Sequence, residues 1–254
     1  MIEKPQGPAP VRPIDVSSLI TALRSGIADF KAAPFIGLFF AAFYVSVGLM
    51  MYWITMATGQ TYWLVLAVMG FPLVGSFAAL GLYETSRRRA AGEPLKLGQI
   101  ASVVWNSRTG QLPWLAVIIV VVFLFWFFLG HMIFALFLGL RSMVNVSTSF
   151  EVYLTSSGLQ MLAFGSVVGA LFASLVFAIS VLGMPMLLDR DVDFVSAMLR
   201  SISAVRAQPV LYLGWGGVIG MVTLLAMIPW FLGLFVILPV LGHTTWHLYQ
   251  AATD

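Results

Sequence analysis

The stretch LPWLAVIIVVVFLFWFFLGHMIFALFLGL, from Leu112 to Leu140, decides the fold class because it contains no Asp, Glu, Lys or Arg. A helix that crosses the hydrocarbon core of a bilayer needs about 20 consecutive, predominantly apolar residues. The stretch exceeds that length, so it predicts a transmembrane helix.

The composition of the whole chain agrees with a membrane protein. Of its 254 residues 60% are hydrophobic and 9% are charged, and the mean hydropathy is +0.98. Soluble domains carry roughly 25% charged residues. The chain has no Cys, which excludes disulfides, iron–sulfur clusters, thiolate zinc sites and a cysteine nucleophile.

Further apolar runs predict an all-α, polytopic protein with six transmembrane helices arranged as three hairpins. One run begins at Phe35, a second at Thr61 and another at Gly158. The span from Val210 to Gln250 is uncharged and about twice the length of one crossing, with a turn expected at Pro229.

The basic residues predict the orientation. Of the 13 Lys and Arg residues, only Arg141 falls on the side opposite the amino terminus in this topology. Loops rich in Lys and Arg stay in the cytoplasm. We therefore expect a multi-pass protein with both termini cytoplasmic.

Each predicted hairpin follows an amphipathic stretch that ends at a proline. The stretches run from Asp15 to Pro34, from Lys96 to Pro113 and from Asp193 to Pro209, with Asp15 and Asp193 as expected N-caps. They predict interfacial helices on the cytoplasmic side and a threefold repeat with units near 15–94, 95–190 and 191–254. The whole of 15–254 is then one membrane domain, preceded by a disordered cytoplasmic tail over the Pro-rich residues 1–14.

Ionisable residues at membrane depth are candidates for function, and the last predicted helix carries His243 and His247, four residues apart. Such a pair shares a helix face, but even an open zinc site needs a third ligand. Glu84 is the nearest candidate carboxylate. The third histidine, His131, is expected toward the outer face, so it cannot pair with either of the others around a haem. We expect no metal, no haem and no other cofactor.

Two charged clusters border the predicted helices. Asp189 and Asp191 precede the expected cap Asp193, but the cluster lacks the glycine turn and distal Glu of a calcium-binding loop. Arg87, Arg88 and Arg89 form a basic cluster typical of an anchor to anionic lipid headgroups. No catalytic or nucleotide-binding motif occurs, so we expect neither an enzyme nor a nucleic-acid partner.

Three strings resemble the signature segments of a family of predicted inner-membrane proteins of unknown function, found mainly in proteobacteria. They are GFPLVGSFAALGLYETSRRRAAGEPL, LLDRDVDFVSAMLRSISAVRAQP and FLGLFVILPVLGHTTWHLYQ. The resemblance implies a bacterial inner-membrane location and no assigned activity. Some members are labelled as similar to cytochrome c oxidase subunit I, but three histidines cannot supply that protein's haem and copper ligands.

Two functions remain open from the sequence. The first is an accessory, scaffolding or assembly component of a larger respiratory or photosynthetic membrane complex, with other membrane subunits and the bilayer as partners. The alternative is a small channel or transporter with a polar site on the cytoplasmic side. The candidate polar site comprises Glu84, His243, His247, Asp189 and Asp191. In the channel or transporter reading, Glu84, His243 and His247 line the pathway.

Overall fold

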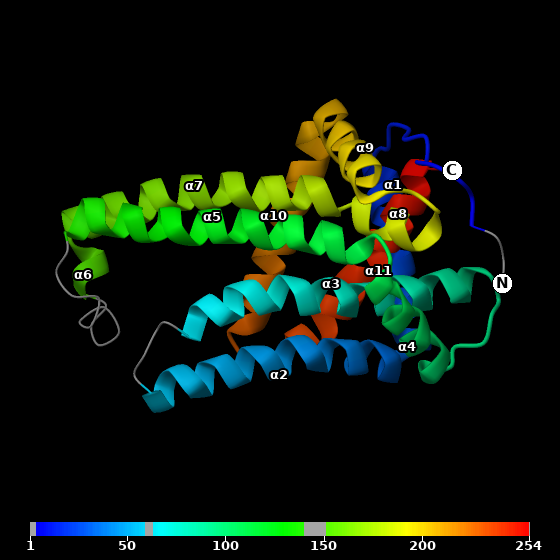
Figure 1. Ribbon diagram of the computed structural model, residues 1–254, viewed down its shortest axis with the longest axis horizontal. Helices are drawn as coiled ribbons and strands as arrows, with labels where there is room; N and C mark the ends of the chain where they lie inside the picture. Colours follow the sequence, from blue (N-terminus) through cyan, green and yellow to red (C-terminus); the bar gives the residue numbers. More distant parts are fainter. Residues whose placement is uncertain (1–3, 59–62, 140–150, 254) are drawn as a thin grey trace.

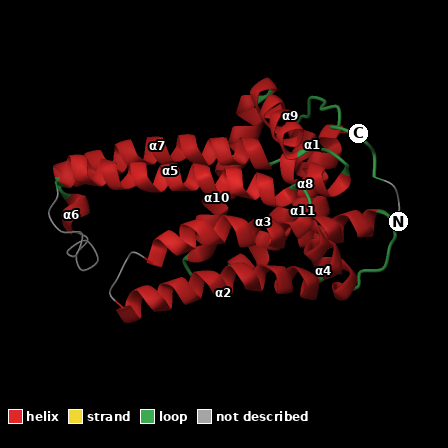
Figure 2. Ribbon diagram, viewed as in Figure 1, coloured by secondary structure: helices red, strands yellow, loops and turns green. Residues whose placement is uncertain are grey.

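The computed structural model describes residues 4–58, 63–139 and 151–253, and the regular elements within them are helices (Figure 2). In chain order these are α1 (Val16–Ala32), α2 (Pro34–Thr58), α3 (Trp63–Ala90), α4 (Leu97–Asn106), the 3-10 helix η1 (Ser107–Thr109), α5 (Leu112–Leu138), α6 (Glu151–Leu154), α7 (Ser156–Ser180), α8 (Gly183–Asp189), α9 (Phe194–Ala207), α10 (Pro209–Met227) and α11 (Leu234–Thr253). The expected all-α class is confirmed.

The molecule is elongated, with the long helix pairs α2/α3 and α5/α7 running toward one end (Figure 1). The shorter helices α1, α4, α8 and α9 gather at the opposite end together with both chain termini (Figure 1). We call this the charged end, because the ion pairs of Glu84 and Asp29 lie there. The connections 59–62 and 140–150, and with them Arg141, fall outside the described residues.

Four described helices are long and apolar enough to cross a bilayer: Pro34–Thr58, Leu112–Leu138, the α7–α8 segment Ser156–Asp189, and Pro209–Met227. The six expected crossings would also include α3 and α11, which are not among these four. In each of the four candidate crossings, between 17% and 28% of an apolar 18-residue segment is buried inside the molecule. Their apolar surfaces are therefore largely available to lipid.

Local sequence signals place several helix boundaries. A carboxylate oxygen of Asp15 accepts a hydrogen bond from the Ser18 backbone N–H at 2.8 Å, and one of Asp193 accepts from the Ser196 N–H at 2.8 Å. Both expected N-caps are confirmed. Proline lacks a backbone N–H and disfavours helical geometry in the residue before it, which explains the breaks between α1 and α2 and between α9 and α10.

A third proline interrupts the second long hairpin. Helix α7 ends at Ser180 and α8 begins at Gly183. Pro185 cannot donate a hydrogen bond to the carbonyl four residues earlier. Within this break the Leu182 N–H donates instead to Oγ of Ser201 in α9, at 3.1 Å. The hydrogen bond from Leu182 to Ser201 thus connects α9 to the segment between α7 and α8.

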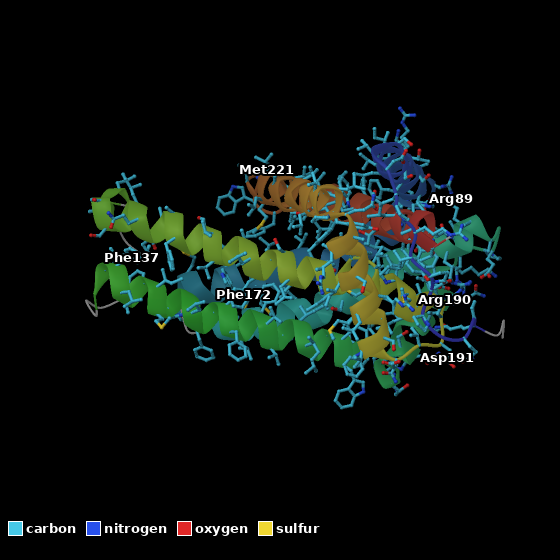
Figure 3. The ribbon with its side chains drawn as sticks, turned by 90° about the horizontal axis from the view of Figure 1, so that it is seen from above. Arg89, Phe137, Phe172, Arg190, Asp191 and Met221 are labelled. Atoms are coloured by element: carbon cyan, nitrogen blue, oxygen red, sulfur yellow. The ribbon has the colours of Figure 1, made fainter. Side chains whose placement is uncertain are left out.

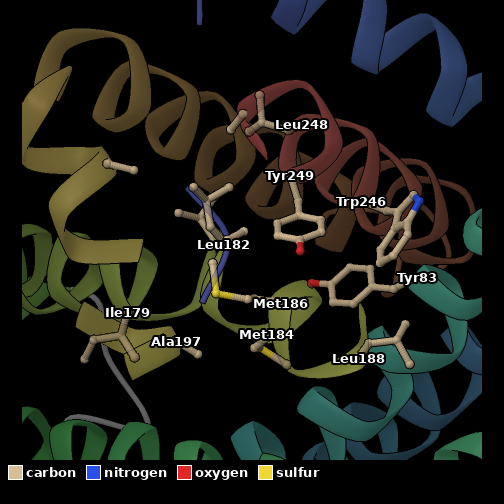
Figure 4. Packing of buried hydrophobic residues seen from close by; sticks show 14 of the residues in the cluster. Tyr83, Ile179, Leu182, Met184, Met186, Leu188, Ala197, Trp246, Leu248 and Tyr249 are labelled. Carbon is tan, nitrogen blue, oxygen red and sulfur yellow. The ribbon is translucent and has the colours of Figure 1, made fainter. Parts of the chain in front are cut away.

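The largest cluster of buried side chains lies near the charged end, between α8, α9, α11 and the end of α3 (Figure 4). Leu182 and Met186 are fully buried, and Tyr83, Trp246 and Tyr249 pack around them. Close packing of this kind holds short helices in fixed positions. The charged end is therefore the rigid part on which the site described below is built.

The amino-terminal residues differ from the expected disordered tail. Ala9 is fully buried, and the Arg12 N–H donates to the Ala252 carbonyl at 2.8 Å. The Gln208 side chain accepts from the Ile14 N–H and donates to the Ile14 carbonyl, both at 2.8 Å. Composition alone favoured disorder, but backbone groups within residues 5–14 find partners on α11, at Gln208 after α9 and at Asp191 after α8.

Candidate functional site at the charged end

The site begins with a close approach between α1 and α11. A Cβ atom on Gly26 would lie 2.3 Å from Oγ1 of Thr244 and 2.7 Å from its backbone nitrogen. Only glycine permits this separation. On the same face of α1, Ala22 and Asp29 are also buried, so the close packing carries a carboxylate into the interface.

Asp29 is the centre of an ion-paired group from three helices. Its side chain is 1% exposed, and its two oxygens contact Nη1 of Arg89 in α3 and Nε2 of His247 in α11, the latter at 2.7 Å. Burial alone would raise the pKa of Asp29, but hydrogen bonds from the side chains of His247, Ser86 and Arg89 outweigh it and hold the pKa below its usual value. Asp29 is therefore ionised at neutral pH and links α1, α3 and α11.

The second histidine has a different partner. His243 is fully buried, and its Nδ1 lies 2.8 Å from Oγ of Ser86 in α3. Its Nε2 has no hydrogen-bond partner among the residues that the structure describes. The expected His243–His247 pair is thus split between two partners, and no group of three potential metal ligands occurs within the described ranges.

Glu84 is paired with the basic cluster that follows it. Its side chain is fully buried and accepts from Nε of Arg87 at 2.7 Å and from Nε of Arg88 at 2.6 Å. Arg88 also donates to Oε1 of Gln99 in α4 at 2.9 Å. The charge of Glu84 is therefore neutralised inside the molecule, and Arg88 bridges α3 to α4.

The arginine cluster was expected to act as a lipid anchor. The structure instead turns its three members toward acidic side chains of the protein: Arg87 and Arg88 toward Glu84 and Glu93, and Arg89 toward Asp29. Arg87 and Arg89 remain partly exposed, at 31% and 40%. Binding of headgroups by these residues stays a prediction.

The acidic residues after α8 have separate roles. Asp189 accepts a hydrogen bond from the Tyr249 hydroxyl at 2.8 Å. The exposed Asp191 pairs through its backbone with the amino-terminal segment: its N–H donates to the Pro5 carbonyl, and its carbonyl accepts from the Gly7 N–H. Figure 3 shows Arg89, Arg190 and Asp191 at the same end of the molecule. The two aspartates hold neighbouring segments and do not converge on one point.

Sequence reasoning missed the two residues that organise the histidines. Asp29 lies within the amphipathic stretch from Asp15 to Pro34, and Ser86 directly precedes the arginine cluster, but neither was singled out as a site residue. A signal for Asp29 was present, because Ala22 and Gly26 precede it by seven and three residues on one helix face. Small residues on the face of an acidic residue indicate a packed interface.

Comparison with known proteins agrees with the membrane class. Residues 64–189, from within α3 to the end of α8, match the model of the family described as "Predicted integral membrane protein (DUF2189)". No curated protein and no solved structure matches the chain. Together with its apolar helices, this similarity identifies an integral, multi-pass membrane protein.

Proposed function

We propose that the protein is a non-catalytic accessory, scaffolding or assembly component of a larger membrane complex of the respiratory or photosynthetic kind. The observation that carries the proposal is an uncovered face on α10. Of the four candidate crossings α10 is the least covered, with 17% of its apolar window buried. Gly214, Gly217 and Gly220 on this helix have open space where a Cβ would stand.

Exposed glycines have a particular meaning inside a bilayer. Transmembrane helices associate by close backbone approach, which small residues permit. Gly216, by contrast, faces inward, where a Cβ would lie 3.2 Å from the Phe177 ring. The glycines of α10 therefore fall into two groups: Gly216 serves packing within the chain, whereas Gly214, Gly217 and Gly220 are available to a helix of another subunit.

The charged end also favours a structural role. Asp29 and Glu84 are bound by side chains of the protein itself, and Asp189 by Tyr249. A general acid or base must reach a substrate proton, and a transport pathway needs polar groups that line a route. Groups that satisfy one another serve to fix the positions of α1, α3, α4 and α11.

The proposed membrane arrangement has six crossings, with α3 and α11 added to the four apolar helices. It places the charged end and both termini in the cytoplasm and the protein in a bacterial inner membrane. Both termini lie at the charged end (Figure 1), which supports their placement on the same side of the membrane. α1, α4 and α9 are then the three interfacial helices of the proposed threefold repeat.

One atom favours the alternative, a small channel or transporter. Nε2 of His243 is buried without a hydrogen-bond partner in the described part of the chain, and such a group is costly unless something pairs with it. A proton or ion passing the charged end would supply that partner. Proton flux into liposomes that contain the protein, and its loss in His243→Ala, would support this alternative.

The accessory role is tested by co-purification. A tagged copy at native expression level is extracted in mild detergent, and the co-purifying proteins are quantified by mass spectrometry. The test variant is Gly214→Ile/Gly217→Ile, which fills the open face of α10. The matched control is Val167→Phe, which adds bulk at an exposed position of α7.

A further inference from the structure

A groove near the charged end lies between the start of α2, the later part of α3 and the helix α4. Its volume is ≈ 430 Å³, within the range of about 300–1,000 Å³ typical of small-molecule sites. Its lining is apolar and aromatic except for one side chain, Arg108 in η1, which follows α4 directly. The groove therefore has an apolar lining and a single positively charged side chain.

The shape of the groove is fixed by close packing beneath it. The buried Phe40 ring lies over Gly81 of α3, where a Cβ would come within 2.2 Å of the ring. Phe39 and Phe43 stand beside it, edge to face at 5.3 Å, and both are more than a third exposed. The groove consequently has a rigid floor and opens at the surface of the molecule.

In the membrane arrangement proposed above, the position of the groove along α2 corresponds to one leaflet of the bilayer. At about 1.5 Å rise per residue, Phe39 and Phe43 lie roughly 7 Å and 13 Å beyond the start of α2 at Pro34. Side chains at that depth face acyl chains, whereas the helix start lies near the headgroups. Trp105 in α4 is 65% exposed and borders the groove, a position typical of interfacial tryptophan.

Arg108 is charged and available. Its guanidinium carbon lies 3.9 Å from the centre of the Trp105 ring, which holds it at the rim of the groove by a cation–π contact. It forms no ion pair with any described carboxylate, unlike Arg87, Arg88 and Arg89. Arginine binds phosphate oxygens through paired N–H donors.

We propose that this groove binds one anionic glycerophospholipid, with an acyl chain against Phe39, Phe43 and Phe77 and the phosphate on Arg108. The site differs from the arginine cluster predicted from sequence, since the cations there are already paired within the protein. It is also independent of the α10 face, so the lipid site and the accessory role can fail separately.

The test is native mass spectrometry of the full-length protein in detergent, titrated with phosphatidylglycerol or with phosphatidylcholine of the same acyl chains. The wild type is expected to retain one phosphatidylglycerol, with about a five- to tenfold preference over phosphatidylcholine. In Arg108→Gln the preference disappears while chain binding remains. In Ala101→Trp, which fills the groove from α4, both lipids are lost.

The matched control is Arg200→Gln, because Arg200 is an exposed arginine of α9 without an ion pair among the described residues. Equal loss of preference in Arg108→Gln and Arg200→Gln would overturn the proposal by showing diffuse charge attraction. Retention of the lipid by a folded Ala101→Trp, or by Ala101→Leu if the larger residue prevents folding, would overturn it as well. Occupation of the groove by a protein chain would do the same.

Discussion

Nε2 of His247 lies 2.7 Å from Oδ2 of Asp29, so a hydrogen bond joins residues that are 218 positions apart in the sequence. The contact fastens the first helix of the chain to the last, and Arg89 of α3 completes it. A buried carboxylate is costly unless its charge is paired and hydrogen bonded. Asp29 is thus the side chain on which the arrangement of the charged end depends most.

Replacing Asp29 with Asn is expected to destabilise the protein, because Arg89 and His247 then lose the charge that pairs with them. Removal of one partner from a fully buried pair costs about 3–5 kcal/mol. Since Arg89 is 40% exposed, we expect a smaller loss of about 2 kcal/mol. Thermal unfolding in detergent measures it.

The matched control is Asp193→Asn, an Asp-to-Asn change at an exposed N-cap. Asn caps helices about as well as Asp, so this variant should unfold close to the wild type. Equal losses in the two variants would mean that the buried ion pair contributes nothing specific.

Acid is expected to weaken the same contact. The pKa of Asp29 in the folded protein is held below its usual value, so its stabilisation is complete above that value and is lost as the pH falls through the folded pKa. The difference in melting temperature between wild type and Asp29→Asn should therefore be constant near neutrality and shrink below about pH 4. A difference unchanged at pH 2–3 would contradict this origin.

The caps respond to acid in the same direction. Hydrogen bonds from the Ser18 side chain and backbone lower the pKa of Asp15 to about 2, and the Ser196 N–H lowers that of Asp193. Both caps persist in the Asp29→Asn variant. The comparison with that variant therefore separates the contribution of Asp29 from the loss of stability in acid that both proteins share.

Gly26→Ala should separate α1 from α11. The added methyl group would meet the backbone nitrogen of Thr244 at 2.7 Å and the carbonyl oxygen of Val240 at 2.9 Å, and these atoms cannot rotate away. Overpacking of this kind costs about 1–3 kcal/mol. Gly98→Ala in α4 is the control, because nothing lies within 4 Å of the new atom. That change should be neutral or stabilising.

Gln208→Leu should release the amino-terminal segment, because the amide of Gln208 makes both hydrogen bonds to the Ile14 backbone. Hydrogen–deuterium exchange of peptides that cover Ile14 should become faster, while exchange in α7 stays unchanged. Gln160→Leu, at an exposed position of α7, provides the matched change. Unaltered exchange at Ile14 would show that other contacts hold the segment.

Local features of the fold could be predicted from the sequence because they depend on neighbouring residues. The caps at Asp15 and Asp193 and the breaks at Pro34 and Pro209 follow from backbone chemistry within one turn. The membrane class follows from the length of the apolar runs, such as Leu112–Leu138.

The site depended on contacts that no local rule reveals. His243 and His247 share a helix face, yet Ser86 and Asp29 bind them separately, and the choice depends on how α1 and α3 pack against α11. The sequence also could not distinguish Gly216, which packs inside, from Gly214 and Gly217, which are open. The order of residues 4–14 was missed for the same reason. Their hydrogen-bond partners Gln208 and Ala252 lie far away in the sequence.

The measurement that tests the accessory role most directly is the quantity of partner recovered with the tagged protein. We expect a near-stoichiometric membrane partner with the wild type and with Val167→Phe. With Gly214→Ile/Gly217→Ile we expect its recovery to fall about tenfold or more, which corresponds to roughly 1.4 kcal/mol of binding free energy. Recovery of the wild type alone, or equal recovery of the partner with both variants, would contradict the proposed role of α10.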